Sequence, residues 1–403
     1  MHGSLGIGSM VSFSFLDERD RPISAINAET GKQVWGGWWY PNLITNQGLD
    51  GIANYNSLGT YADGYSYPRT DAPGIRNTMG LATGSFQVKR ASAAITLAQS
   101  GNTVTASAAF FNSGDVGAEI VWDNATRATI TGYTSPTAVT VADSKSVSAT
   151  PATLWAVQLT TMPGQVETGN SSGGNVGSVT AYASGADLVV EAVIPTVVQL
   201  TADRNLTGFR FGPDGNNSAH IVENFRDAGG NPITVSLSTG KKVRVDHLLQ
   251  MRISGSQAAQ TLNFNVYDAA NQLISSNPVN VNYKARWPNI AADIILVLNP
   301  NYNTAGLSLA GAGETLNSTN WSQINSNVNL GTYTPGQFKR TKTVTVSEAN
   351  GNGTWIGWAF ERQAGSIGNF PGVRCVLNSG NFTKNNTQQM SFDLELSWGR
   401  EYL

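Results

Sequence analysis

Residues 390–398 read Met-Ser-Phe-Asp-Leu-Glu-Leu-Ser-Trp, so apolar and polar side chains alternate along the whole stretch. Successive side chains of a β-strand point to opposite faces, and this period of two therefore predicts a strand with one buried face. The same alternation recurs in shorter stretches, which are residues 11–16, 102–108, 138–141, 233–237 and 262–267. The repeated pattern predicts a chain made mainly of half-buried strands.

Turn-forming residues separate these stretches at short intervals. Gly, Asn, Asp, Ser and Pro gather at residues 100–102, 113–115, 229–232 and 350–353. Closely spaced turns favour antiparallel sheets over sheets in which strands alternate with helices. We therefore expect an all-β protein with two or three antiparallel β-sandwich or barrel-like domains and at most one or two short helices.

One helix and one linker can be placed. Residues 46–55 carry Leu49, Ile52 and Ala53 at the spacing of one helical face, which predicts a short helix. Residues 163–178 are rich in Gly, Ser and Asn and predict a loop or linker.

The linker and a second, weaker break divide the chain. We expect an N-terminal β domain at residues 1–165, a central sandwich at 166–285 and a C-terminal β domain at 286–403. The boundary at 286 is the weaker one, and a single domain over residues 176–403 is the alternative.

The composition excludes several classes of protein. Charged residues make up 13% of the 403 positions, about half the usual share of roughly 25%, and the net charge is −2. Such a chain lacks the excess of Lys and Arg that a broad nucleic-acid surface needs. It also lacks an apolar run of about 18 residues, so we expect no membrane span.

The cysteine and histidine content and the absence of known motifs argue against catalysis and metal binding. The chain holds one cysteine and three histidines, too few for a cysteine-based zinc cluster. It shows no nucleophile elbow, phosphate-binding loop or zinc-protease motif. We predict no catalytic residue, no metal and no cofactor. The N-terminus has no signal-peptide pattern, so we expect folding in a reducing cytoplasm.

The most unusual stretch is aromatic. Trp35, Trp38, Trp39 and Tyr40 lie within six residues, interrupted by two glycines. Such side chains bury a large area at small entropic cost and could anchor a protein interface or stack on sugar rings. The interpretation that we favour is that they close one end of a β core. If the segment forms an interface, these four residues are our candidates for its anchors.

A cluster of charges follows the first predicted strand. Residues 17–21 read Asp-Glu-Arg-Asp-Arg. Carboxylates this close could bind a cation. The interpretation that we favour is a solvated hairpin tip in which opposite charges pair with one another.

Pro41–Ala53 resembles the opening of a group of virion structural proteins of tailed bacteriophages, which often begin with the phrase N-L-I-T-N-x-G-L-D. Here the phrase stands at residues 42–50. Leu206–Gly212 resembles a strand of the same proteins, with Gly208 where they have an acidic residue. Leu394–Arg400 resembles their closing amphipathic strand. The resemblance implies a tail, neck or capsid-surface component without a catalytic residue set.

Three functions remain open at this point. The first is a structural subunit in the tail, neck or collar, baseplate or capsid surface, made in the bacterial cytoplasm and assembled with copies of itself and other virion proteins. The second is a fibre or adhesin that binds a receptor or a host-surface glycan. The third is a β-rich polysaccharide hydrolase, because paired carboxylates can meet in space without a sequence signature.

Overall fold

The computed structural model describes residues 2–53, 78–170, 179–184, 187–212, 219–253, 261–268, 273–282, 306–311, 322–324, 327–330, 334–361, 371–377 and 382–402. This part of the chain is built from mainly antiparallel sheets and one short α-helix, α1 (Asn46–Ala53), with a single 3₁₀ turn at Ser113–Asp115. The all-β prediction is confirmed. Each alternating stretch named above overlaps an observed strand.

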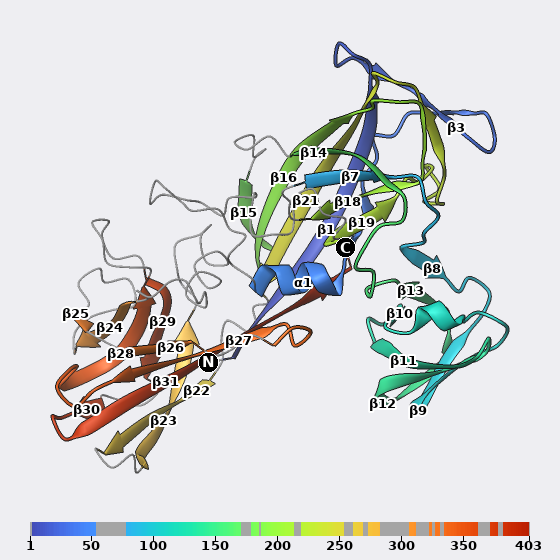
Figure 1. Ribbon diagram of the computed structural model, residues 1–403. Helices are drawn as coiled ribbons and strands as arrows, with labels where there is room; N and C mark the ends of the chain where they lie inside the picture. Colours follow the sequence, from blue (N-terminus) through green and yellow to red (C-terminus); the bar gives the residue numbers. More distant parts are fainter. Residues whose placement is uncertain are drawn as a thin grey trace.

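The largest sheet runs through much of the molecule (Figure 1). Its main path follows, in order, β15 (Val179–Ser184), β16 (Asp187–Gln199), β21 (Lys242–Ile253), β1 (His2–Leu16), β31 (Gln388–Glu401), β22 (Thr261–Asp268), β23 (Leu273–Asn282), β29 (Pro371–Leu377), β28 (Gly353–Glu361), β24 (Gly306–Gly311) and β25 (Ser322–Ile324). Beside this path lie β2 (Pro22–Ile23), β5 (Tyr40–Pro41), β26 (Asn327–Leu330), β27 (Lys339–Val346) and β30 (Phe382–Lys384).

Three smaller sheets complete the described fold. One contains β8 (Lys89–Ala91), β13 (Ala152–Trp155), β10 (Glu119–Trp122), β11 (Arg127–Ser135), β12 (Ala138–Thr150) and β9 (Leu97–Ala106). A second contains β14 (Gln165–Asn170), β7 (Thr78–Ala82), β18 (Gly208–Gly212), β19 (Ile221–Asn224) and β6 (Leu43–Ile44). The third contains β17 (Arg204–Leu206), β20 (Val235–Leu237), β3 (Ala25–Asn27) and β4 (Gln33–Val34).

The long strand β1 holds the main sheet together. One edge pairs with β21 along its C-terminal two thirds, from Gly6 opposite Arg252 to Leu16 opposite Lys242. The N-terminal half of its other edge pairs in parallel with β31. Strands from all three expected domains therefore share this sheet. The division of the chain into domains stays a prediction, and the 286 boundary lies outside the described residues.

The upper lobe in Figure 1 is a sandwich between β16-β21-β1 and the five-stranded sheet. Phe13 and Phe15 of β1 are buried, as their alternation predicts, and both rings contact Phe225. From the opposite sheet, Phe211 stacks on the ring of His247 at a centroid distance of 5.3 Å. The core of this lobe is therefore aromatic.

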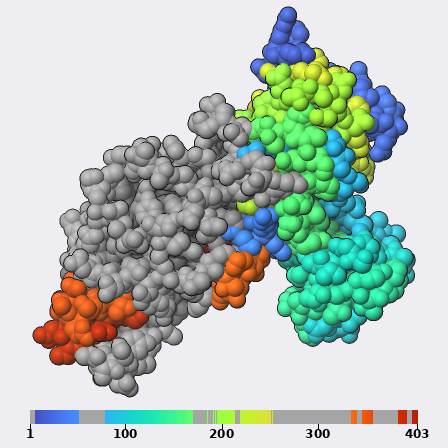
Figure 2. Space-filling model, in the orientation of Figure 1, coloured from blue at the N-terminus to red at the C-terminus, as the bar shows by residue number. Residues whose placement is uncertain are grey.

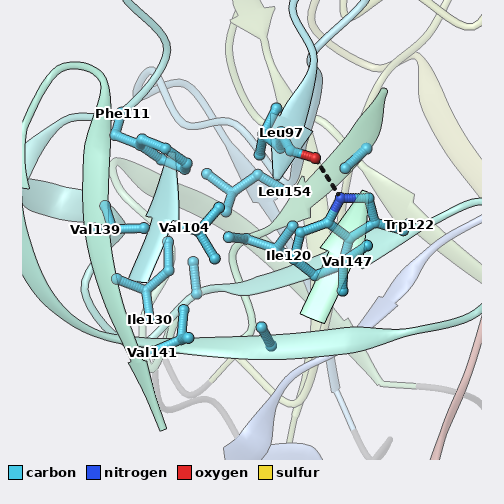
Figure 3. Close-up of a cluster of buried hydrophobic side chains, with 13 residues drawn as sticks. Leu97, Val104, Phe111, Ile120, Trp122, Ile130, Val139, Val141, Val147 and Leu154 are labelled. Atoms are coloured by element: carbon cyan, nitrogen blue, oxygen red, sulfur yellow. Dashed lines mark hydrogen bonds between the residues drawn. The ribbon is translucent and has the colours of Figure 1, made fainter. Parts of the chain in front are cut away.

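Residues 88–157 form a separate six-stranded module that protrudes from the body (Figure 2). Its core is aliphatic apart from Phe111 and Trp122 (Figure 3). The Trp122 indole Nε1 donates to the Leu97 carbonyl oxygen at 3.1 Å, which satisfies the one polar group that the ring buries.

The linker prediction for residues 163–178 is wrong at residues 165–170. These residues form β14 and pair with β7, for example Gly169 with Met79. The backbone of a strand can hydrogen-bond to its neighbour whether its side chains are polar or apolar. Composition alone therefore could not detect this strand. Residues 171–178 lie outside the described part.

Candidate functional site

The aromatic segment lies against the free part of the β1 edge. Where β31 ends, Tyr40 of β5 pairs with Val11, and Gly37 donates its backbone NH to the Phe13 carbonyl at 2.8 Å. Gly36 has a φ of +69°, and a Cβ at this position would lie 2.2 Å from the Phe13 oxygen. Only glycine fits this close approach, and it turns the chain so that the aromatic side chains point in different directions.

Two of the four predicted anchors belong to the core. Tyr40 is 7% exposed, and its hydroxyl donates to the Asn224 carbonyl at 3.4 Å. Burial raises the pKa of Tyr40 well above its usual value, and the charge of Glu223 adds to this. Trp38 is half-buried, with its ring edge-on to Phe13 at 6.3 Å.

The other two anchors lie on the surface. Trp35 is 55% exposed and Trp39 is 42% exposed. Both rings would lose water contact if another molecule covered them, and burying large aromatic rings contributes strongly to binding. The structure thus divides the predicted set into Trp38 and Tyr40, which pack against the lobe, and Trp35 and Trp39, which are exposed.

Next to Trp35 lies one face of the four-stranded sheet, which we call the tip face. The cross-strand register places four of its side chains in a row, and these are Asn205, Ser236, Ile26 and Gln33. Ile26 is 41% exposed, although it is apolar. The Ser236 hydroxyl donates to Asn205 Oδ1 at 2.6 Å, which fixes the orientation of that amide. The row is uncharged.

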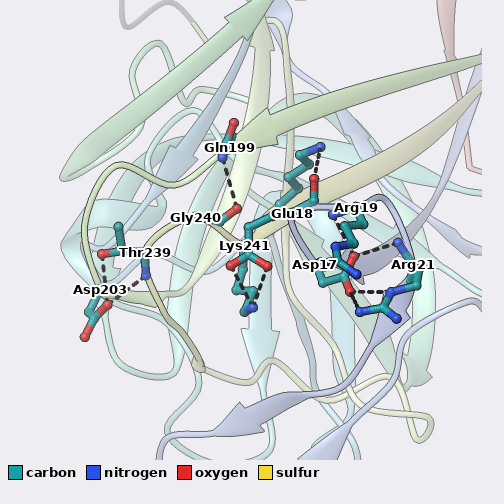
Figure 4. A network of polar contacts seen from close by, with 10 residues as sticks. Asp17, Glu18, Arg19, Arg21, Gln199, Asp203, Thr239, Gly240 and Lys241 are labelled. Atoms are coloured by element: carbon teal, nitrogen blue, oxygen red, sulfur yellow. Dashed lines mark hydrogen bonds and ion pairs between the residues drawn. The ribbon is translucent and has the colours of Figure 1, made fainter.

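The charged residues 17–21 form the predicted hairpin tip between β1 and β2 (Figure 4). Asp17 accepts the Arg21 side-chain Nε at 2.7 Å and the backbone NH groups of Arg19 and Arg21 at 2.9 Å. The backbone hydrogen bond from Arg21 is the largest of the effects that lower the pKa of Asp17 to about 2.

The neighbouring carboxylates pair with lysines at the start of β21. Glu18 accepts Lys241 Nζ at 2.8 Å, and Asp20 accepts Lys242 Nζ at 2.7 Å. Pairing within the cluster is confirmed for Asp17 and Arg21, whereas Glu18 and Asp20 pair with lysines of a distant segment. In the described residues, no group of three or more His, Cys, Asp or Glu side chains is placed to hold a metal ion.

A second constellation involves residues 42–50, the segment that carries the bacteriophage resemblance. Thr45 precedes α1, and its hydroxyl oxygen accepts the Gly48 NH at 3.0 Å, an N-terminal cap. The same hydroxyl donates to the Ala219 carbonyl at 2.5 Å. A Cβ on Gly48 would lie 2.2 Å from the His220 carbonyl oxygen, so glycine allows the helix to approach the residue that precedes β19.

The end of β31 binds this segment and the six-stranded module at once. Arg400 donates to the Ile44 carbonyl, to Asn46 Oδ1 at 2.6 Å and to Glu119 Oε2 at 3.0 Å. Tyr402 donates its hydroxyl to the same Glu119 oxygen at 2.5 Å. We call these five residues the C-terminal junction.

Aromatic contacts support the C-terminal junction. The Tyr402 ring packs on Trp155 of the module at a centroid distance of 4.6 Å, and the Arg127 guanidinium lies over the Tyr402 ring at 5.0 Å. Trp398 donates its indole NH to the Leu49 carbonyl at 2.8 Å. The sequence gives no local sign of these contacts, because their partners lie about 240 to 350 positions away.

Several charged groups are buried inside the upper lobe. Glu223 and Arg226 form an ion pair at 2.6 Å with side-chain exposures of 0% and 2%. Burial raises the pKa of Glu223, although Arg226 opposes this. Arg210 donates from Nε to Gln165 Oε1 at 2.5 Å, and its Nη atoms have no hydrogen-bond partner in the described structure. None of these side chains reaches the surface, so they serve the interior of the lobe.

Comparison with known proteins gives no relative. No protein-family model, no curated protein and no solved structure matches the chain. Among the described residues, no helix is both long and apolar enough to cross a membrane.

Proposed function

We propose that this chain is a structural subunit of a tailed-bacteriophage virion that assembles in several copies. The observation that carries the proposal is the combination of the resemblance at Pro41–Ala53 with the exposed rings of Trp35 and Trp39. The position within the particle is left open among the tail, neck or collar, baseplate and capsid surface.

The contacts of residues 42–50 support this role. Asn46 and the Leu49 carbonyl are bound by side chains of β31, and the Thr45 hydroxyl is bound to the Ala219 carbonyl. This is the use expected of a segment that sets an architecture, because a catalytic segment would direct its polar groups towards a substrate. The segment fixes how the lobe and the protruding module are joined.

The exposed tryptophans support a protein contact at the tip. Hot spots of interfaces are enriched in Trp, and replacing one by Ala commonly costs 2 kcal/mol or more, roughly 30-fold in affinity. When many copies assemble, the same contact is repeated between neighbours, so the affinity of each single contact can be low. We expect Trp35 and Trp39 to be covered in the particle.

Light scattering of the purified protein over a range of concentrations tests the proposal. We expect oligomers for the native chain and a shift towards monomer for a Trp35→Ala, Trp39→Ala double variant. Tyr133→Ala is the matched control, because Tyr133 is a 37% exposed aromatic residue on the distant module. Mass spectrometry of purified virions should also detect the chain. A native chain that stays monomeric at every concentration and is absent from virions would refute the role.

The second candidate function is glycan binding at the tip face. The observation in its favour is the uncharged row beside Trp35, because amides and hydroxyls bind sugar hydroxyls while an aromatic ring packs on the sugar face. A glycan array separates the two functions. Binding that is lost in Gln33→Ala while the oligomeric state is retained would favour the glycan function.

A further inference from the structure

The hairpin that joins β27 to β28 encloses a buried lysine. Lys384 is the last residue of β30, it pairs with Gly353 at the start of β28, and it is 1% exposed. Lysine is almost never this buried unless its ammonium group is held by several partners. The partners here all come from the hairpin residues 348–352 and from the next residue, Asn385.

The ammonium group contacts a side-chain amide. Lys384 Nζ donates to Asn352 Oδ1 at 2.9 Å, to the Glu348 carbonyl at 3.1 Å and to the Asn385 carbonyl at 3.3 Å. Given a C=O bond of about 1.2 Å, the first distance places Nζ about 3 to 4 Å from Asn352 Cγ. That separation approaches the range in which two groups held together begin to react.

The amide is also fixed from its other end. Asn352 Nδ2 donates to the Glu348 carbonyl at 3.0 Å, so both polar atoms of the carboxamide are engaged. Trp355 closes over the hairpin, with its indole NH bound to the Gly351 carbonyl at 2.9 Å. The reacting groups are therefore held in one arrangement before any reaction.

The surroundings of the lysine shift its pKa. Burial lowers the pKa of Lys384 below its usual value, and the charge of Glu348 opposes this with a smaller effect. The Glu348 carboxylate itself accepts Gln389 Nε2 at 2.6 Å. Lowering this pKa increases the fraction of neutral amine, which is the nucleophilic form.

We propose that Lys384 and Asn352 join through an intramolecular amide bond once the chain has folded. The Nζ atom attacks Asn352 Cγ, the Cγ–Nδ2 bond breaks, and ammonia leaves. The lysine ammonium loses two protons in all, and the departing nitrogen takes both to leave as ammonium. No oxidant, reductant or other reactant is needed.

The bond would tie the β27–β28 hairpin to β30. With only three residues, β30 has few backbone hydrogen bonds to hold it against β28. A covalent link at its end would close the chain segment between residues 352 and 384 and restrict the unfolded ensemble, as a disulfide does in a chain with paired cysteines. This inference goes beyond the proposed function and does not depend on it.

Intact-mass spectrometry of the full-length purified protein tests the bond. We expect the native chain to lack the mass of one ammonia molecule and Lys384→Met to show its full calculated mass. Asn352→Ala should likewise show its full calculated mass. A native chain with its full calculated mass would overturn the proposal.

One side reaction also releases ammonia, and the experiment has to distinguish it from the cross-link. Asn350 and Asn352 each precede a glycine, and such pairs can cyclise to a succinimide within the backbone. A succinimide would persist in Lys384→Met and would be cleaved by hydroxylamine. The cross-link would appear after trypsin digestion as a branched peptide that joins residue 352 to residue 384. Loss of ammonia that persists in Lys384→Met, without a branched peptide, would also overturn the proposal.

Discussion

Replacing Arg400 by alanine should uncouple the six-stranded module from the rest of the protein. The Arg400 side chain is 7% exposed and binds the Ile44 carbonyl, Asn46 Oδ1 and Glu119 Oε2. Its removal leaves the Glu119 carboxylate, which is 12% exposed, with Tyr402 as its remaining partner at the C-terminal junction. The variant therefore loses its contacts to α1 and to the module together.

The size of the expected stability loss follows from the burial of the ion pair between Arg400 and Glu119. Removing one partner of a buried ion pair costs about 3–5 kcal/mol, because the other charge stays desolvated. Hydrogen bonds to a charged group contribute roughly 1.5–3 kcal/mol each, and the retained Tyr402 bond keeps the total from being a simple sum. We expect the free energy of unfolding to fall by about 3–4 kcal/mol.

Urea unfolding followed by tryptophan fluorescence measures the loss. We expect a lower midpoint in Arg400→Ala, and a transition that splits because the module, with its own Trp122 core, no longer unfolds with the body. Arg244→Ala is the control, because Arg244 is 44% exposed and its ion pair with Asp246 should contribute less than about 1 kcal/mol. Equal effects of the two variants, with a single transition in both, would refute the reasoning.

Three further predictions concern single residues. Trp122→Ala should cost about 3–5 kcal/mol in the free energy of unfolding, measured by urea titration, because it empties the module core and frees the Leu97 carbonyl. Gly36→Ala should lower the melting temperature measured by circular dichroism, since its φ of +69° and the contact with Phe13 exclude a Cβ, whereas Gly31→Ala has open space and should lower it less. The hydrogen bonds of Asp17 lower its pKa from 3.8 to about 2, so its contribution to stability is present above pH 4 and is lost as the pH falls towards 2. Asp17→Asn should flatten the dependence of stability on pH in that window, and an unchanged profile would contradict the assignment.

Local patterns predicted the strands and the helix well. The alternation at residues 11–16 and 390–398 lies within β1 and β31, and the spacing of Leu49, Ile52 and Ala53 marks α1. These features depend on which side chains lie on one face, and the sequence contains that information directly. The same alternation does not predict which strand pairs with which.

The aromatic segment shows where such a prediction stops. Composition correctly marked residues 35–40 as unusual, but it could not separate Trp35 from Trp38. The backbone bend at Gly36 and Gly37 decides that separation, and the bend depends on hydrogen bonding to Phe13 of β1. Arg400 was missed for a similar reason, since its partners Asn46 and Glu119 come from distant parts of the chain.

The parallel pairing of β1 with β31 has a consequence for folding. Gly8 lies opposite Glu401, so β1 acquires this partner only after residues 9–400 have been synthesised. Contacts between such distant residues are slow to form because a long loop must close first. Until then the edge of β1 is exposed, and exposed edges promote wrong pairing. The C-terminal junction forms at the same step, because Arg400 belongs to β31. Completion of this pairing and fixing of the module are therefore one event, which takes place when β31 folds against β1.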